Sequence, residues 1–407
     1  MAQFDKKYVF ILGRLAALSL AEIRSLLLAD EKIIASGDIA LVSLSQPLAD
    51  PQKTLDSLGG TIKIGQIFAS ISLPTKNLTD EASQKIANRI LEKFSSHSSK
   101  INYGISAYNL PMRHENFLKN LLKNVKHRLA EAKKSSRFVN KNFENVRSVV
   151  DSDIDFLVMG TGAEIYLAET VAVQNFKSYE LRDYAKPCRD MESGMLPPKI
   201  AQIMINLSGL RKFSKESTAP AANSAPFTIY DPFCGSGTIL TEALLMGLNA
   251  IGSDISAKAI SDSEKNIKWI MEKYRLTGTL ADVFQKNINS LTQKDLHEKI
   301  DAIVAECYLG PRITRPLHTD ALRRTNTELS TLYEVALKKF KELKLACPVV
   351  LAIAAFKNRD KYYFIENFPA TAKKLGFKIA ALSNLPRGSL IYNRPDQFVA
   401  REIFLLN

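Results

Sequence analysis

The chain has 407 residues, of which 46% are hydrophobic and 24% are charged. This is the composition of an ordinary globular protein, and it excludes collagen-like and wholly disordered chains. At roughly 100–200 residues per domain, the length predicts a protein of more than one domain. Lys and Arg number 55 against 42 Asp and Glu, so the net charge is +13, which is compatible with a polyanionic partner such as a nucleic acid.

Cysteine spacing and hydropathy indicate the cellular compartment in which we expect the protein. No two of the four cysteines have a C-x-x-C spacing, so neither a metal site nor a disulfide framework is predicted. Free thiols suit a reducing cytoplasm, where we expect the protein. The N-terminal apolar run is interrupted by Arg14 and has no small-residue cleavage site, so no signal peptide is predicted. No uncharged apolar stretch is long enough to cross a bilayer, and we expect no membrane partner.

Residues 1–75 alternate strand-like and helical patterns, which is typical of a small α+β domain. Short strands are predicted at residues 8–12, 39–44 and 61–71. Ser19, followed three residues later by Glu22, has the pattern of a capped helix start.

Residues 76–180 form a second alternating stretch, in which a long helix is predicted over residues 114–134. One face of this helix is apolar and the other is basic. The basic face is either a solvated surface or a contact surface for RNA phosphates, and its candidate residues are Lys119, Lys123, Lys126 and Arg137.

Two further segments before the C-terminal region read as loops. The alternating Asp151, Asp153 and Asp155 are not followed by a calcium-loop spacing, so a polar loop is predicted there. Residues 213–226 are rich in Ser, Ala and Pro and predict a flexible surface loop. From Phe227 onward, strands and helices alternate as in a doubly wound parallel α/β sheet.

The most informative segment is DPFCGSGT at residues 231–238, which lies between a short strand and a helix. A second strand follows and ends at Asp254. Glycines allow a tight turn and close approach of a ligand to the backbone, and an acid at the end of the second strand can accept both hydroxyls of a ribose. The alternative interpretation is an incidental glycine turn.

The ligand of this turn is predicted from its charge. A dinucleotide site would have a third glycine where the chain has Leu240, and Asp231 would repel a pyrophosphate. A cationic nucleoside such as S-adenosylmethionine satisfies both Asp231 and Asp254. Asp282, taken as the end of a third strand, is a candidate acceptor for the adenine amino group, or else a helix cap.

The DPFCGSGT segment resembles the first motif of class I methyltransferases that act on exocyclic amines of nucleobases. Residues 182–201 (RDYAKPCRDMESGMLPPKIA) resemble the segment before the catalytic domain in the archaeal and eukaryotic tRNA guanosine-10 N2-methyltransferases. Residues 8–179 are similar in pattern to the ferredoxin-like and THUMP module of that family, and residues 389–394 resemble its closing strands.

This resemblance implies an architecture and a function. It implies a ferredoxin-like domain over 1–75, a THUMP-like RNA-binding domain over 76–180 and a Rossmann-like methyltransferase domain over 181–407. The implied activity is S-adenosylmethionine-dependent N2-methylation of a guanosine in tRNA, by a monomer with a small activating subunit as a candidate partner. The implied cofactor contacts are Pro197, Asp231, Phe233, Cys234, Gly235, Gly237, Thr238, Asp254, Ile255, Asp282 and Val283.

The catalytic motif departs from the family pattern. Amine methyltransferases carry Asp/Asn-Pro-Pro-Tyr/Phe after the fourth strand, whereas this chain has Glu306-Cys307-Tyr308-Leu309. The candidate catalytic residues are therefore Glu306, Cys307 and Tyr308: Glu306 accepts a hydrogen bond from the amine or takes its proton, and Tyr308 stacks on the base. Without the two prolines the motif loses their rigidity.

Several functional alternatives follow from this departure. A working variant of the motif is favoured over a fold that only binds RNA, and Glu306 as a plain surface acid is a third possibility. Arg312 and Arg315 after the motif either grip phosphates or are solvated. An rRNA or DNA amino-methyltransferase shares the same core, although the N-terminal module argues against DNA. In-line displacement requires neither a metal nor a covalent enzyme intermediate.

Overall fold

The computed structural model describes residues 4, 6–28, 30–72, 79–94, 100–110, 114–139, 153–162, 164–190, 195–212, 226–359, 361–380, 387–394 and 397–407. Two predicted loops fall partly or mostly outside these residues. They are the loop at 213–226, of which only Pro226 is described, and the polar loop that includes Asp151. In the described residues, no helix is both long enough and apolar enough to cross a membrane.

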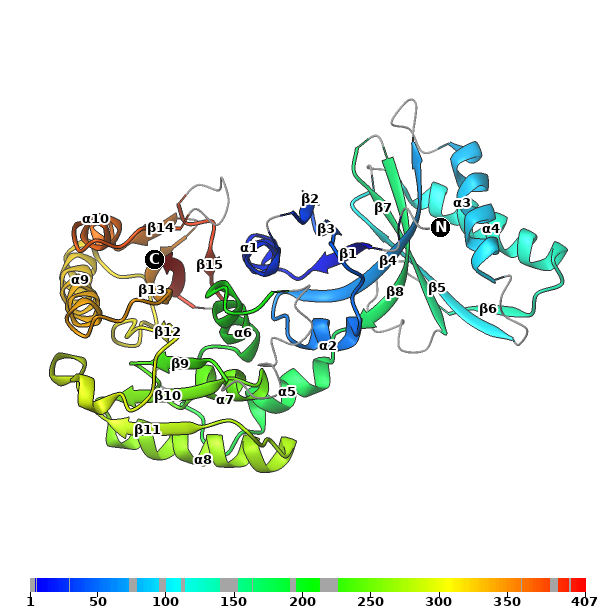
Figure 1. Cartoon of the computed structure of the whole chain (residues 1–407). Helices are drawn as coiled ribbons and strands as arrows, with labels where there is room; N and C mark the ends of the chain where they lie inside the picture. Colours follow the sequence, from blue (N-terminus) through cyan, green and yellow to red (C-terminus); the bar gives the residue numbers. More distant parts are fainter. Residues whose placement is uncertain are drawn as a thin grey trace. The chain divides into compact units, whose positions relative to one another are not determined.

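The chain forms two compact units (Figure 1). The N-terminal unit comprises residues 1–16, 27–56 and 61–174. The C-terminal unit comprises residues 175–407 together with two short pieces from the beginning of the chain, residues 17–26 and 57–60. The first of these pieces is most of helix α1 (Ala16–Leu26).

The N-terminal unit is built on one eight-stranded sheet with the order β2-β3-β1-β4-β8-β7-β5-β6. Its strands are β1 (Lys7–Leu12), β2 (Lys32–Ser36), β3 (Ile39–Ser43), β4 (Thr61–Ser72), β5 (Ile101–Tyr108), β6 (Ser136–Phe138), β7 (Ile154–Gly160) and β8 (Glu164–Val173). The antiparallel pairing of β4 with β8 joins the strands from residues 1–75 to those from 76–180 in this sheet. A division into two domains at residue 75 stays a prediction.

Three helices accompany this sheet: α2 (Pro51–Asp56), α3 (Asp80–Phe94) and α4 (His114–Glu131). Helices α3 and α4 place their apolar stripes in one core with the sheet, which includes Ile86 and Ile90 from α3 and Leu121 and Val125 from α4. The long helix predicted over residues 114–134 from its apolar periodicity is confirmed, and it ends three residues earlier than predicted.

Two predictions for polar residues in the first half of the chain are wrong. Asp155 lies inside β7 rather than in a loop, where it is buried and accepts a hydrogen bond from Lys63 Nζ at 3.0 Å. Glu22 lies inside α1, not at its first turn, and accepts hydrogen bonds from the amides of Gly59 and Gly60, both at 2.9 Å. In both cases specific partners offset part of the cost of burying the carboxylate, and such long-range partners cannot be identified from a local pattern.

The C-terminal unit contains a second sheet with the order β11-β10-β9-β12-β13-β16-β15, and β14 pairs with β13. Strands β9 to β13 are parallel, and β16 is antiparallel to β13. The strands are β9 (Thr228–Asp231), β10 (Asn249–Asp254), β11 (Ala281–Gln285), β12 (Ala302–Glu306), β13 (Val349–Asn358), β14 (Lys361–Phe364), β15 (Ile391–Tyr392) and β16 (Val399–Leu406).

Helices cover this sheet in the doubly wound manner that the sequence predicts. They are α5 (Phe176–Tyr184), α6 (Pro198–Leu207), α7 (Thr238–Leu245), α8 (Ala257–Tyr274), α9 (Thr319–Glu342), α10 (Phe368–Lys374) and the short 3₁₀ turns η2 (Ile288–Ser290) and η3 (Gln293–Asp295). One core joins α9 and α10 to side chains such as Tyr230, Ile303 and Leu351. Helices α7 and α8 contact β10.

The strand order places the functional region. The chain builds β9, β10 and β11 toward one edge and then returns to add β12 and β13 on the other side of β9. A crevice forms at the carboxyl ends of the strands where the order reverses, and ligands of open α/β sheets bind there. The ends of β9 and β12 flank this point.

Candidate functional site

A pocket of about 480 Å³ lies at the carboxyl ends of β9, β10, β11 and β12. Four of its lining residues lie at these strand ends or within two residues of one: Asp231, Asp254, Asn287 and Glu306. Three of the four carry carboxylates. The pocket therefore lies at the switch point of the sheet and presents acceptor oxygens to a ligand.

Asp231 at the end of β9 is almost completely buried. Burial raises the pKa of Asp231 well above its usual range, and the nearby carboxylates of Asp254 and Glu306 raise it further. One of its oxygens accepts a hydrogen bond from the Phe233 amide at 3.0 Å, which begins the turn after the strand. A cationic ligand in the pocket would stabilise the ionised form of Asp231.

The glycine turn that follows is fixed by Asp254. One carboxylate oxygen accepts from the Gly235 amide at 3.0 Å and the other from the Ser256 amide at 2.9 Å. Gly235 and Gly237 have φ of +54° and +79°, which is the left-handed region that favours glycine. A Cβ at Gly235 would meet no heavy atom within 4 Å, so the backbone here borders open space that a ligand can enter.

Most of the predicted cofactor contacts lie around this pocket. Its lining includes Asp231, Phe233, Cys234, Gly235, Thr238, Asp254 and Ile255. Two further predicted contacts flank it: Gly237 caps the start of α7, and Pro197 caps the start of α6 next to the lining residue Leu196.

The prediction that Asp282 ends the third strand is wrong. Asp282 is the second residue of β11, where it pairs with Ile251, and the strand continues to Gln285. Asp282 and Val283 instead line a shallow groove beside α8. The residues that follow the true strand end, Lys286 to Asn289, line the pocket. Asn287 accepts a hydrogen bond from the Asn289 amide at 2.9 Å. The polar sequence K-N-I-N at residues 286–289 is the local pattern that indicates a loop here.

The variant motif begins at the end of β12. The Glu306 carboxylate forms an ion pair with Arg401 of β16, whose guanidinium lies 5.5 Å from the Tyr392 ring centre. Cys307 is buried, and burial raises the pKa of its thiol, so it is not poised as a thiolate. Tyr308 is 53% exposed. All three residues line the pocket.

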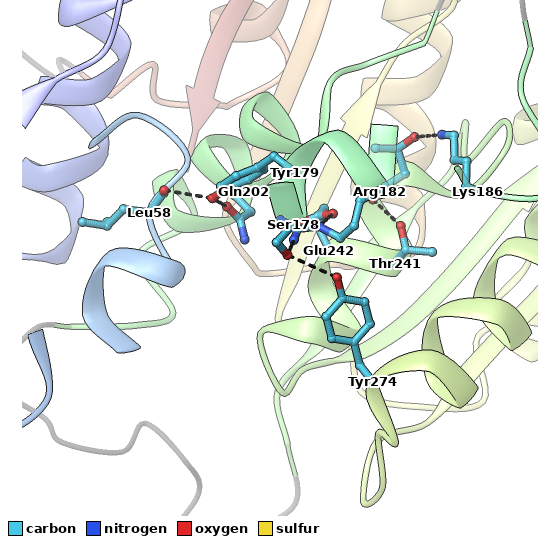
Figure 2. Close-up of polar contacts among 10 residues, drawn as sticks. Leu58, Ser178, Tyr179, Arg182, Lys186, Gln202, Thr241, Glu242 and Tyr274 are labelled. Atoms are coloured by element: carbon cyan, nitrogen blue, oxygen red, sulfur yellow. Dashed lines mark hydrogen bonds and ion pairs between the residues drawn. The ribbon is translucent and has the colours of Figure 1, made fainter. Parts of the chain in front are cut away.

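Buried polar side chains of residues 182–186, which precede the DPFCGSGT motif in sequence, contact side chains of α7 (Figure 2). Arg182 and Glu242 form an ion pair at 2.7 Å with both side chains buried. Lys186 donates to Thr238 Oγ1 at 3.0 Å, and burial lowers the pKa of Lys186. The segment that resembles a known family element therefore fixes the helix that follows the glycine turn.

The predicted RNA-contacting residues are exposed. Lys119, Lys123 and Lys126 lie on the solvent face of α4 in the N-terminal unit, and Arg137 follows in β6. Arg312 and Arg315 are exposed in the segment after the variant motif. Within the described part of the chain, none of these six residues forms an ion pair, and Lys126 Nζ lies 5.9 Å from the centre of the Phe138 ring.

Comparison with known proteins agrees with this geometry. Residues 187–360 match the RMKL-like methyltransferase domain. The chain is 34% identical over 113 residues to a tRNA (guanine(10)-N2)-dimethyltransferase of Methanothermobacter thermautotrophicus, covering 28% of this chain and 27% of the relative. It is 27% identical over 150 residues to the enzyme of the same name from Methanocaldococcus jannaschii, covering 35% and 38%.

The chain thus matches less than two fifths of the length of each of these curated relatives. A wider likeness is seen in the fold. The crystal structure of TrmN from Thermus thermophilus is 16% identical, with a TM-score of 0.52 over 98% of this chain and 99% of that one. The glycine turn and the strand order agree with this match, and residues 187–360 are similar to the RMKL-like methyltransferase domain.

Proposed function

We propose that the protein is an S-adenosylmethionine-dependent methyltransferase that methylates N2 of a guanosine in tRNA. The observation that carries this proposal is the convergence of Asp231, Asp254 and Glu306 on one pocket at the switch point of the sheet. The names of the two archaeal relatives support guanine N2 as the target and tRNA as the substrate.

The residues of the pocket fit the cofactor. Asp254 can accept the ribose hydroxyls, and buried Asp231 offers a negative charge to the cationic methionine end. In this proposal Asn287, which lines the pocket, is the acceptor for the adenine amino group in place of Asp282, which lies outside the pocket lining. When bound, the cofactor supplies an electrophilic methyl group on a sulfonium, and the sulfur becomes a thioether when the methyl leaves.

Glu306 is the residue that acts on the target amine. The lone pair of an exocyclic amine is delocalised into the base, and acceptors on both N–H bonds direct it toward the methyl group. Arg401 pairs with Glu306 Oε1, and Oε2 has no hydrogen-bond partner in the described residues. Oε2 is thus available to accept an amine N–H and then to take the proton that the methylated nitrogen loses. In this proposal the exposed ring of Tyr308 stacks on the base.

The N-terminal unit binds the tRNA in this proposal, with a ferredoxin-like part over 1–75 and a THUMP-like part over 76–180. The exposed lysines of α4 supply phosphate contacts. The enzyme acts as a monomer, with a small activating subunit as a candidate partner. Arg312 and Arg315, which follow the variant motif, contact phosphates beside the target nucleotide.

The experiment offers the purified protein three substrates with labelled S-adenosylmethionine: unmodified tRNA, rRNA and duplex DNA. The proposal predicts transfer to tRNA, with N2-methylguanosine identified by mass spectrometry of the nucleosides. Transfer confined to rRNA or DNA would replace the proposed substrate. Tight RNA binding without any transfer would identify a non-catalytic RNA-binding protein.

A further inference from the structure

Tyr333, in the middle of α9, makes an unusual bridge beneath the variant motif. Its side chain is fully buried, and its ring packs edge-on against Phe368 with the ring centres 6.1 Å apart. Its hydroxyl donates to the Tyr308 carbonyl at 2.8 Å and accepts from the Ala354 amide at 3.2 Å. One oxygen atom therefore connects the motif to the neighbouring strand β13.

The bridge interrupts the hydrogen-bond ladder of two parallel strands. The amides of Ile303 and Cys307 donate to the carbonyls of Pro348 and Ala352, at 2.9 and 3.0 Å, in the regular parallel pattern. Continuation of that pattern would pair the Ala354 amide with the Cys307 carbonyl. The Ala354 amide is instead bonded to the Tyr333 hydroxyl.

This diversion changes what the pocket offers. In the described residues, no donor is bonded to the Cys307 carbonyl, and Cys307 is a lining residue of the pocket. A carbonyl outside the ladder retains its capacity to accept a hydrogen bond. Two hydrogen-bond acceptors, one for each N–H of the target amine, direct its lone pair toward the methyl group. Glu306 provides one of these two acceptors.

We propose that Tyr333 is a positioning residue: by taking the Ala354 amide and holding the Tyr308 peptide, it leaves the Cys307 carbonyl free to accept the second N–H of the target amine. This inference rests on the proposed methyl transfer. It also explains how the segment is held without the two prolines of related motifs. The rigidity comes from a hydroxyl on a helix far along the chain instead of from the motif itself.

Substitution Tyr333→Phe tests the inference, because it removes the bridging oxygen and keeps the buried ring. The free Ala354 amide is then available to the Cys307 carbonyl. We expect kcat for methyl transfer to tRNA to fall at least tenfold, while KM for tRNA and Kd for S-adenosylmethionine stay within about twofold of the wild-type values.

Tyr230→Phe is the matched control. It also removes a buried hydroxyl from the same core, but that hydroxyl is bonded to Ser253 at 2.8 Å and not to the motif segment. We expect its kcat to remain near the wild-type value, and circular dichroism to show all three proteins equally folded.

The possible outcomes separate the two levels of the proposal. An active wild type with an equally active Tyr333→Phe variant would overturn the positioning role alone. A variant that loses cofactor affinity, tRNA affinity and kcat together would show that Tyr333 only maintains the fold. A wild type that transfers no methyl group to tRNA would contradict the proposed function, and the inference would be lost with it.

Discussion

Glu306 at the end of β12 and Arg401 on β16 form an ion pair across a separation of 95 residues in sequence. The Arg401 side chain is 3% exposed and the Glu306 side chain 19%. The pair therefore holds a carboxylate at the inner edge of the pocket, in the position where related motifs carry a shorter Asp or Asn.

Substitution Arg401→Met is expected to impair both activity and stability. Removing one partner leaves a largely buried charge unpaired, which costs about 3 kcal/mol of unfolding free energy. We also expect kcat to fall more than tenfold because Glu306 loses its fixed orientation. Urea unfolding and methyl-transfer assays measure the two effects.

The double variant Arg401→Met/Glu306→Gln is the control for that experiment. It removes both charges, so the unfolding free energy should recover while activity stays low. Recovery of activity in the double variant would remove Glu306 from the mechanism.

Substitution Asp254→Asn is expected to weaken S-adenosylmethionine binding. A hydrogen bond to a charged group contributes about 1.5–3 kcal/mol, so Kd should rise roughly 10- to 100-fold. Calorimetry measures this directly. Asp282→Asn is the matched control, because Asp282 lies outside the pocket lining, and its Kd should not change. Equal weakening in both variants would contradict the site as described.

The Glu306 carboxylate is expected to favour guanine over bases with a ring acceptor at the same edge. Guanine presents two adjacent donors, N1–H and the N2 amine, which Glu306 Oε2 can accept together, whereas 2-aminopurine keeps the amine but has an acceptor at N1 that repels Oε2. A tRNA with 2-aminopurine in place of its methylated guanosine should be a poor substrate for the wild type.

In Glu306→Gln, the side-chain amide can donate to N1, so the preference for guanine over 2-aminopurine should narrow. The ratio of kcat/KM for the two tRNAs measures it. A wild type that methylates both tRNAs equally would show that Glu306 does not read the base.

Replacing Lys119, Lys123 and Lys126 of α4 by Gln is expected to weaken tRNA binding and reduce its salt dependence. Each phosphate contact contributes about 0.7–0.9 to the slope of log K against log salt, so the slope should fall by about 2–3. Filter binding at several salt concentrations measures it. The same substitution of Lys265, Lys268 and Lys273 on α8 removes equal charge and should leave the slope nearly unchanged if α4 is the contact surface.

Stability of the C-terminal unit is expected to decrease as the pH rises toward neutrality because of Glu22. Burial raises the pKa of Glu22 to about 7 from 4.5, so the folded state binds the proton more tightly than the unfolded state. Between these two pH values the unfolding free energy should fall by roughly 3 kcal/mol. In Glu22→Gln, the unfolding free energy measured by thermal unfolding should change little with pH over this range. If the wild type and the variant show the same pH dependence, Glu22 is not its cause.

The local parts of the site could be predicted from sequence. The turn at residues 231–238 and Asp254 belong to one strand-helix-strand unit. Their spacing in sequence is therefore enough to predict that Asp254 lies beside the turn. Asp282 was misplaced because the end of β11 is set by pairing with β10, which extends the strand to Gln285. An isolated acid after an apolar run does not reveal that pairing.

The remaining features depend on contacts between distant segments. Arg401 and Tyr333 act on the motif from β16 and α9, and neither carries a local pattern that distinguishes it from a surface Arg or a core Tyr. The buried partnership of Lys63 with Asp155 is of the same kind, since the two residues lie 92 positions apart. Sequence periodicity identified the elements, whereas these long-range polar pairs required the structure.

The most direct test is to incubate the protein with unmodified tRNA and S-adenosylmethionine and to analyse the nucleosides by mass spectrometry. N2-methylguanosine or N2,N2-dimethylguanosine is expected, and it should be abolished or strongly reduced in Asp254→Asn. Methylation of another base or another atom, or the absence of any methylated product while the cofactor is bound, would contradict the account.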